Sequence, residues 1–113
     1  MSFQGTELIA GTETLVTTLG IFSQGRGVIP ALSPLMLDEE SGALVIYDGA
    51  TLGKAIYVSA ISVDTDTRSQ AQVYKCGVLN VDALNWPESV NTLNQRVTAF
   101  AGSGISVQPL SAV

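Results

Sequence analysis

The chain has 113 residues and a mass of 11.8 kDa, which is the size of one ordinary domain. Charged residues make up 13% of it, against about 25% in an average soluble domain, while 46% of the residues are hydrophobic. So little charge predicts that other chains cover part of the surface. The net charge is −5 and the 5 Lys and Arg residues are scattered singly, which argues against nucleic-acid binding.

Targeting and redox signals are absent. The first cation is Arg26 and no apolar run approaches the ~18–20 residues of a membrane span, so we expect neither a secretory signal nor a membrane partner. We therefore expect synthesis in the cytoplasm. Cys76 is the single cysteine, which excludes an intrachain disulfide, and the absence of histidine removes the commonest general base and transition-metal ligand.

Glycines recur every few positions in residues 1–28 and exclude a helix there. Within this segment lies a short β-prone stretch, isolated by Gly11 and Gly20, that consists of Leu15, Val16, Thr17, Thr18 and Leu19. We predict that residues 1–28 form a flexible N-terminal arm with one latent strand, which is the candidate binding segment. The alternative is an ordinary N-terminal strand of the core sheet.

The next part of the chain is typical of short strands joined by turns. Pro30 and Pro34 exclude a long helix in the apolar run that ends at Leu37. Turns are expected at Asp38-Glu39-Glu40-Ser41-Gly42 and at Asp48-Gly49. The predicted strands cover residues 43–47, 54–63, 69–74, 77–81 and 105–107, with a bulge or turn at 75–77.

One short helix is predicted from Pro87 to Gln95. Proline suits the first helical turn, and Val90, Leu93 and Val97 recur at helical spacing. Residues 29–107 therefore form the predicted domain, and residues 108–113, which include Pro109, form a C-terminal tail.

The patterns that could carry chemistry are weak. Asp64 and Asp66 lack the remaining ligands of a calcium loop, and the three acids at 38–40 are expected to be solvated rather than to form an acid–base pair. Gly102-Ser103-Gly104 precedes a strand, not the helix that a phosphate site needs. Cys76 has no histidine to activate it. We therefore expect no enzyme, no metal, no cofactor and no small-molecule substrate.

Trp86 is the single tryptophan and is followed by Pro87. A platform for carbohydrate stacking is one interpretation, but a lone tryptophan in a small domain is usually part of the core. We predict a structural core that contains Trp86, Pro87 and Phe100.

From Pro30 onward, over roughly two thirds of the chain, the sequence resembles the head decoration protein D family of lambda-like bacteriophages. The residues that carry the resemblance occur in the family's order and near its spacing. They are Pro30-Ala31, Pro34 to Asp38, Leu44-Val45, Asp48-Gly49, Tyr74-Lys75, Gly77, Trp86 to Glu88, Arg96, Thr98 to Gly102, and Ile105-Ser106.

The resemblance implies a compact α+β fold of mostly short strands, of the β-clip type, that forms a homotrimer. It implies a structural protein of the virion that binds the outside of the expanded head and stabilises it, with the major capsid protein as its partner. In the family the N-terminal arm becomes ordered on the shell and adds a strand to the capsid protein. The low charge and the β-prone stretch of the arm agree with this function.

Two other classes of function remain as alternatives. A virion-surface module that recognises host glycans would use Trp86 and the tyrosines, but these lie within apolar stretches. A trimeric enzyme on the same scaffold would need a carboxylate or metal site at the subunit boundary, and no pattern in the sequence supplies one.

Overall fold

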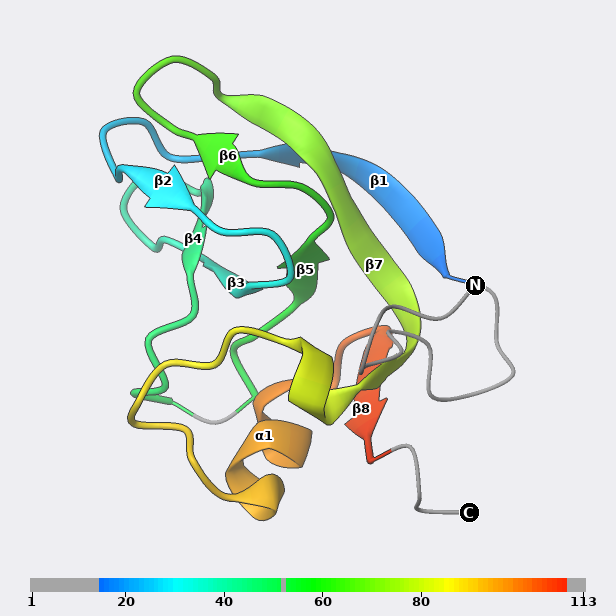
Figure 1. Cartoon of the computed structure of the whole chain (residues 1–113). Helices are drawn as coiled ribbons and strands as arrows, with labels where there is room; N and C mark the ends of the chain where they lie inside the picture. Colours follow the sequence, from blue (N-terminus) through cyan, green and yellow to red (C-terminus); the bar gives the residue numbers. More distant parts are fainter. Residues whose placement is uncertain (1–14, 52, 110–113) are drawn as a thin grey trace.

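The longest strand, β7 (Gln70–Asn80), runs through the middle of the computed structural model, which describes residues 15–51 and 53–109 (Figure 1). Residues 70–76 of β7 pair antiparallel with β1 (Val16–Ile21), and part of the same stretch pairs with β5 (Tyr57–Ser59). Residues 77–80 pair in parallel with β8 (Ile105–Gln108). β7 therefore joins the first and last strands of the described chain in one sheet.

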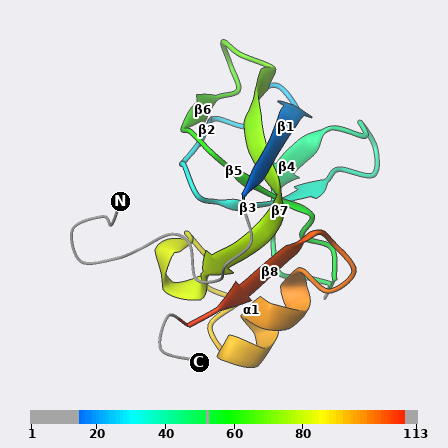
Figure 2. The same ribbon diagram turned by 90° about the vertical axis from the view of Figure 1, so that its right-hand side faces the viewer.

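The main sheet has the strand order β1-β7-β5-β3-β4, with β8 beside β7, and a second sheet pairs β2 with β6. The remaining elements are β2 (Val28–Ile29), β3 (Pro34–Leu37), β4 (Leu44–Ile46), β6 (Val63–Asp64), the 3-10 helix η1 (Val81–Ala83) and α1 (Leu93–Ala99). The small sheet lies at one end of the molecule and α1 with β8 at the other (Figure 2). Mostly antiparallel strands with one short helix confirm the predicted α+β class. No helix in the described part of the chain is long and apolar enough to cross a membrane.

β7 is continuous, so the prediction of two separate strands was wrong. The bulge expected at residues 75–77 is present, because Val16 pairs with Cys76 and Thr17 with Tyr74, which leaves Lys75 as an extra residue in β7. Gly77 has φ +131°, a conformation that glycine adopts without the strain of a Cβ. A Cβ at this position would collide with the side chain of Leu15. Gly77 also begins the pairing with β8, so it marks the point where β7 changes its neighbours.

The strand predicted over residues 54–63 is also shorter, since β5 covers only Tyr57–Ser59. The N–H of Ala55 donates to the carbonyl of Ala99, at the end of α1, over 3.0 Å. The N–H of Ile56 donates to the carbonyl of Leu35 over 2.8 Å. The β-branched residues indicated extended backbone, but Ala55 bonds to a helix end instead of a strand, and the ladder stops.

The helix prediction was right in kind and wrong in its bounds, because α1 begins at Leu93 rather than at Pro87. Thr92 is the N-cap: its Oγ1 accepts the N–H of Gln95 over 3.2 Å, and the Oε1 of Gln95 accepts the N–H of Thr92 over 3.1 Å. This reciprocal capping box fixes the start of the helix. Pro87 lies in a preceding turn, where its carbonyl accepts the N–H of Val90.

The predicted apolar face of the helix was wrong as well. Leu93 and Val97 are both exposed, and Ala99 is the buried residue of α1. Val90 is buried, but it precedes the helix. Because the capping box starts the helix later, the spacing of Val90, Leu93 and Val97 does not describe one helical face.

Two clusters of buried side chains form the interior. The larger cluster lies beneath η1, α1 and β8 and contains Tyr47, Ala55, Val58, Leu79, Val81, Leu84, Val90, Ala99, Phe100, Ile105 and Val107. The smaller cluster lies between the main sheet and the β2-β6 pair and contains Phe22, Ile29, Leu35, Leu44, Val63, Ala71 and Val73.

The main sheet nearly closes on itself after β1. The N–H of Phe22 donates to the carbonyl of Ser69 over 2.7 Å, and the N–H of Ser23 donates to the carbonyl of Leu44 over 3.0 Å. Phe22 thereby forms an isolated parallel bridge to Leu44, at the start of β4. The chain after β1 thus connects the two outer strands of the main sheet and covers the smaller cluster.

Candidate docking surfaces

The acidic residues considered above as candidates, at positions 38–40, 64 and 66, lie in or beside turns. The carboxylate of Asp64 accepts the N–H of Asp66 over 3.0 Å, which is a turn contact rather than the start of a calcium loop. Among residues 15–51 and 53–109 there is no group of three metal-ligating side chains. The thiol of Cys76 is partly buried on β7. The candidate sites of this fold are therefore surfaces that can bind another chain.

Trp86 is partly buried and packs against the larger cluster. Its ring lies edge-on to that of Phe100 with centroids 5.8 Å apart, and its Nε1 donates to the carbonyl of Val81 over 2.8 Å. The guanidinium of Arg96 lies 5.6 Å from the ring centroid. Phe100 is buried and Pro87 is half-buried. Trp86 thus has Arg96 and Phe100 against it, which disfavours a sugar-stacking platform.

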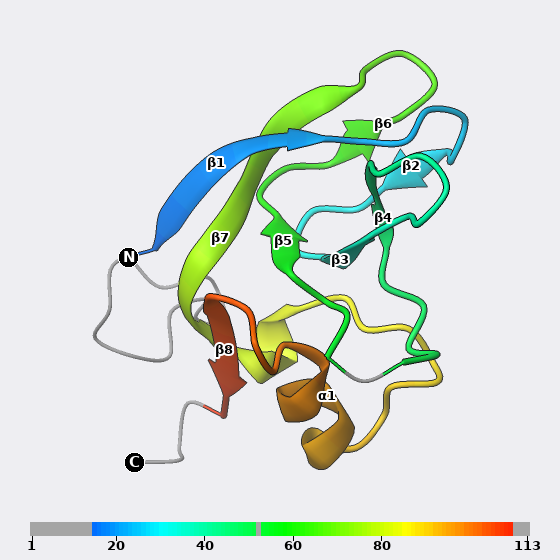
Figure 3. The ribbon, with the colours of Figure 1, turned by 180° about the vertical axis from the view of Figure 1, so that it is seen from behind.

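The structure describes only part of the candidate binding segment, which is the expected N-terminal arm. Residues 1–14 of the expected arm lie outside the described residues. Leu15 packs against the larger cluster, and Val16 to Leu19 belong to β1, which is the alternative arrangement considered from the sequence. β1 lies beside β7 at the margin of the sheet (Figure 3).

β1 has an unused hydrogen-bonding edge, called here the β1 edge. The N–H of Phe22 points to β7, and bonding alternates along an antiparallel pair, so the backbone groups of Thr17, Leu19 and Ile21 point away from β7. The bond from the N–H of Ala60 to the carbonyl of Gln72, opposite Leu19, agrees with this register. In the part of the chain that the structure describes, no strand pairs with Thr17 and Leu19 on this side, whereas the parallel bridge between Phe22 and Leu44 lies next to Ile21.

The side chains beside the β1 edge are apolar or uncharged. Leu19 and Ile21 are 52% and 48% exposed. Their neighbours across the pair are Gln72 and Gln70, both exposed. Sequence analysis identified β1 but missed the two glutamines, whose alternation with buried Ala71 and Val73 was the available signal.

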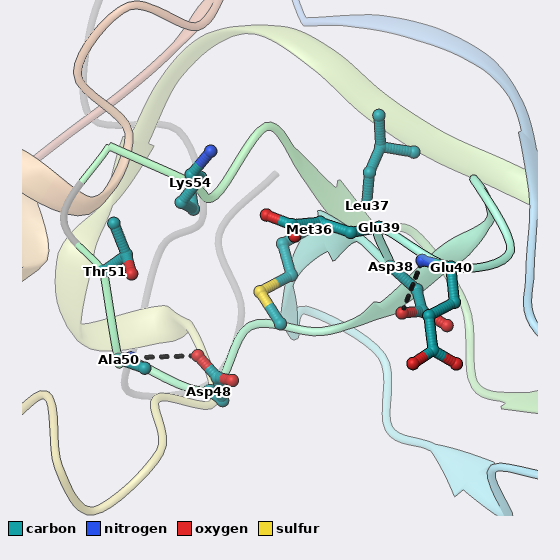
Figure 4. A pocket seen from close by; sticks show the side chains of 9 residues that line it. All are labelled: Met36, Leu37, Asp38, Glu39, Glu40, Asp48, Ala50, Thr51 and Lys54. Atoms are coloured by element: carbon teal, nitrogen blue, oxygen red, sulfur yellow. Dashed lines mark hydrogen bonds between the residues drawn. The ribbon is translucent and has the colours of Figure 1, made fainter.

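A second surface is a hollow at the end of β3, called here the β3 groove (Figure 4). This hollow has a volume of about 320 Å³. The β3 groove also includes a neighbouring hollow of about 480 Å³, which shares Leu37, Asp38, Glu39 and Lys54 with the first. The acidic turn after β3 forms one side, and Thr51 and Lys54 form the other (Figure 4). The sequence predicted the turn but not the groove, because the groove forms only when residues 48–54 fold against β3.

Two titratable groups near this groove have shifted pKa values. The pKa of Asp38 lies below its ordinary 3.8, because its carboxylate accepts the N–H of Glu40 and the hydroxyl of Ser41, and the charge of Arg26 adds to this. Burial raises the pKa of Tyr47 above its ordinary 10.0, and the charge of Asp48 adds to the effect. Neither shift is typical of a catalytic pair, since the two groups bond to turns and loops.

Comparison with known proteins agrees with a surface-binding role. The sequence matches the family Bacteriophage lambda head decoration protein D over residues 5–107, which includes most of the segment preceding Pro30. It is 42% identical over 100 residues to the head decoration protein of Enterobacteria phage P21, covering 88% of this chain and 84% of that protein. It is 40% identical over 78 residues to a putative decoration protein of Escherichia phage N15, covering 69% and 70% of the two chains. The chain therefore belongs to the lambda head decoration protein D family.

Proposed function

We propose that this chain is a capsid decoration protein, a structural part of a phage head that binds the shell and stabilises it. The observation that carries the proposal is its membership of the family, with 42% identity to a head decoration protein over most of both chains. Within the described residues, the absence of a metal-ligating group and the solvated acidic turns suit a structural rather than a catalytic part.

The finer proposal is that the protein acts as a homotrimer on the outer surface of the shell. The support is physical: large hydrophobic side chains are exposed on several elements, and only 13% of the residues carry charge. Exposed apolar area of this kind is typical of surfaces that bind other chains. The exposed side chains include Val16, Leu19, Ile21, Val28, Leu37, Ile46, Ile61, Leu93 and Val97.

We assign the strand exchange with the capsid protein to the β1 edge and the residues before it. The edge combines outward backbone groups with exposed Leu19 and Ile21, and these are the features that strand addition uses. In this arrangement residues 15–109 form the body, and residues 1–14 extend the contact along the shell. Three such contacts in one trimer raise the effective concentration of each, so modest contacts give tight binding overall.

The test is binding to expanded phage heads that lack decoration. Purified protein is mixed with the heads, and bound protein is measured by co-sedimentation and located by electron cryomicroscopy. Added density at three-fold positions, with three chains in each feature, is the expected result. Heads that neither gain density nor become more resistant to heat contradict the proposed function.

A further inference from the structure

The β3 groove consists of two adjoining open hollows rather than a closed ligand cavity. Its two hollows, of about 320 and 480 Å³, adjoin at Leu37 and Lys54. One continues toward Met36 and Thr51, and the other toward Gly42 and Ile56. Two open hollows that adjoin at the end of a strand suit an extended chain better than a compact small molecule.

The floor of the groove is apolar and accessible. Leu37 is 52% exposed although it belongs to a strand. The side chain of Met36, also partly exposed, points away from that of Leu37 and lines only the first hollow (Figure 4), whereas partly exposed Ile56 lines only the second. Leu37 also lines both hollows. An apolar side chain of a partner that covers Leu37 would remove this area from water, which is favourable by about 25 cal/mol per Å².

The rim of the groove carries an excess of negative charge. Asp38, Glu39, Glu40 and Asp48 line it, against the single cation Lys54. Asp38 is bound to Arg26, with Oδ2 and Nη2 3.1 Å apart. In the described chain the other three rim carboxylates have no ion pair and are exposed, so their charges can attract a cationic partner at the groove.

These two properties specify one occupant. We propose that the β3 groove binds an extended, positively charged segment of the capsid protein, with an apolar side chain over Leu37 and lysine or arginine side chains against the rim. Charge complementarity selects the sign of the partner, because a neutral or acidic segment would leave three carboxylates uncompensated or repelled. The inference rests on the proposed function and adds a second contact, separate in the fold from the β1 edge.

The decisive variant removes the rim charge without changing side-chain size, through Glu39→Gln, Glu40→Gln and Asp48→Asn together. All three residues are exposed, and Asp48 is the one whose carboxylate bonds within its own turn, to the N–H of Ala50. A matched control removes three exposed acids that do not line the groove, through Asp66→Asn, Asp82→Asn and Glu88→Gln. Both variants change the net charge equally, so they separate a local contact from a general effect of charge.

Binding to undecorated heads is measured by co-sedimentation at salt concentrations from about 50 to about 500 mM, a range over which exposed charges become strongly screened. The groove variant should bind about tenfold more weakly at low salt, and its binding should lose most of its dependence on salt. The control variant should bind as the unmodified protein does. Leu37→Ser should weaken binding while the salt dependence remains.

Several results would overturn the inference. Equal binding by the groove variant and the unmodified protein removes the groove contact but leaves the decoration function intact. Equal weakening in both triple variants shows a general charge effect. A groove variant that dissociates into single chains in sedimentation shows that the groove contacts another copy of this chain. If the unmodified protein does not bind heads at all, the proposed function fails together with the inference.

Discussion

The hydroxyl of Ser59 ties β5 to the turn before β3, because it accepts the N–H of Ser33 over 3.0 Å. The same hydroxyl donates to the carbonyl of Pro30 over 2.8 Å. Both serines are buried, so water does not replace these bonds. The turn that contains Leu32, at φ +62°, is thus held from inside the molecule.

Ser59→Ala should therefore destabilise the protein by about 1–3 kcal/mol, because it leaves a buried N–H without its acceptor. Urea unfolding followed by circular dichroism measures the change. Ser62→Ala, at an exposed position just after β5, is the control and should have little effect. An unchanged unfolding midpoint for Ser59→Ala would mean that the turn holds itself without this bond.

Trp86→Ala should destabilise the protein by about 3 kcal/mol, at the lower end for tryptophan because the side chain is only partly buried. Trp86→Phe keeps an aromatic ring against Phe100 but loses the bond to Val81, so it should cost about 1 kcal/mol. Thermal unfolding of both variants gives the comparison. A variant that keeps its melting temperature but loses binding to a glycan would instead identify Trp86 as a ligand residue.

The helix start shows why part of this fold was predictable and part was not. The expectation of one short helix rested on Pro87 and on apolar spacing, and both are weaker than the reciprocal bonds between Thr92 and Gln95. That capping signal was present in the sequence. Thr92→Ala should cost about 1 kcal/mol, measured by urea unfolding, while Thr98→Ala, within the last turn, serves as a comparison outside the cap.

Other features depend on contacts distant in sequence. Glycine at 77 suggested a break, but whether β7 turns or continues depends on Leu15 and on β8, which arrive from the two ends of the chain. The β3 groove likewise depends on how residues 48–54 pack against β3. The class of fold followed from local patterns and from resemblance, whereas the surfaces required the tertiary arrangement.

The stability that Asp38 contributes should depend on pH in the acid range. The N–H of Glu40 is the main group that lowers the pKa of this carboxyl below 3.8. A lowered folded-state pKa contributes stability that is complete above the unfolded-state pKa, near 3.9, and is lost as the pH falls through the folded value. The difference in unfolding midpoint between the unmodified protein and Asp38→Asn should therefore be constant near neutral pH and shrink below about pH 4.

Urea unfolding at a series of pH values measures this difference. Glu39→Gln removes a charge from the same turn without removing a side-chain hydrogen bond within the described part of the chain, and it is the control for net charge. A difference between the two proteins that stays constant down to the acid transition would show that the bonds to Asp38 do not depend on its ionisation.

The adjacent threonines of β1 allow a matched test of the β1 edge. By the alternation of the β1-β7 pair, the N–H of Thr18 points to β7 and that of Thr17 points outward. Proline removes an N–H, and strands tolerate it where that N–H faces away from the ladder. Thr18→Pro should therefore destabilise the fold, whereas Thr17→Pro should leave folding and oligomeric state nearly unchanged.

If a strand of the capsid protein docks at the β1 edge, the Thr17→Pro variant should bind undecorated heads much more weakly. The reason is that it lacks the backbone N–H that residue 17 would donate to the added strand. Thr17→Ala keeps the N–H and controls for the lost side chain. Deletion of residues 1–14 leaves β1 in place, and it separates the contribution of the preceding segment from that of the edge. Circular dichroism and sedimentation establish that each variant is folded, and co-sedimentation with heads measures binding. Full binding by folded Thr17→Pro would show that no strand pairs with this edge, and would leave the β3 groove and the apolar surfaces to hold the protein on the shell.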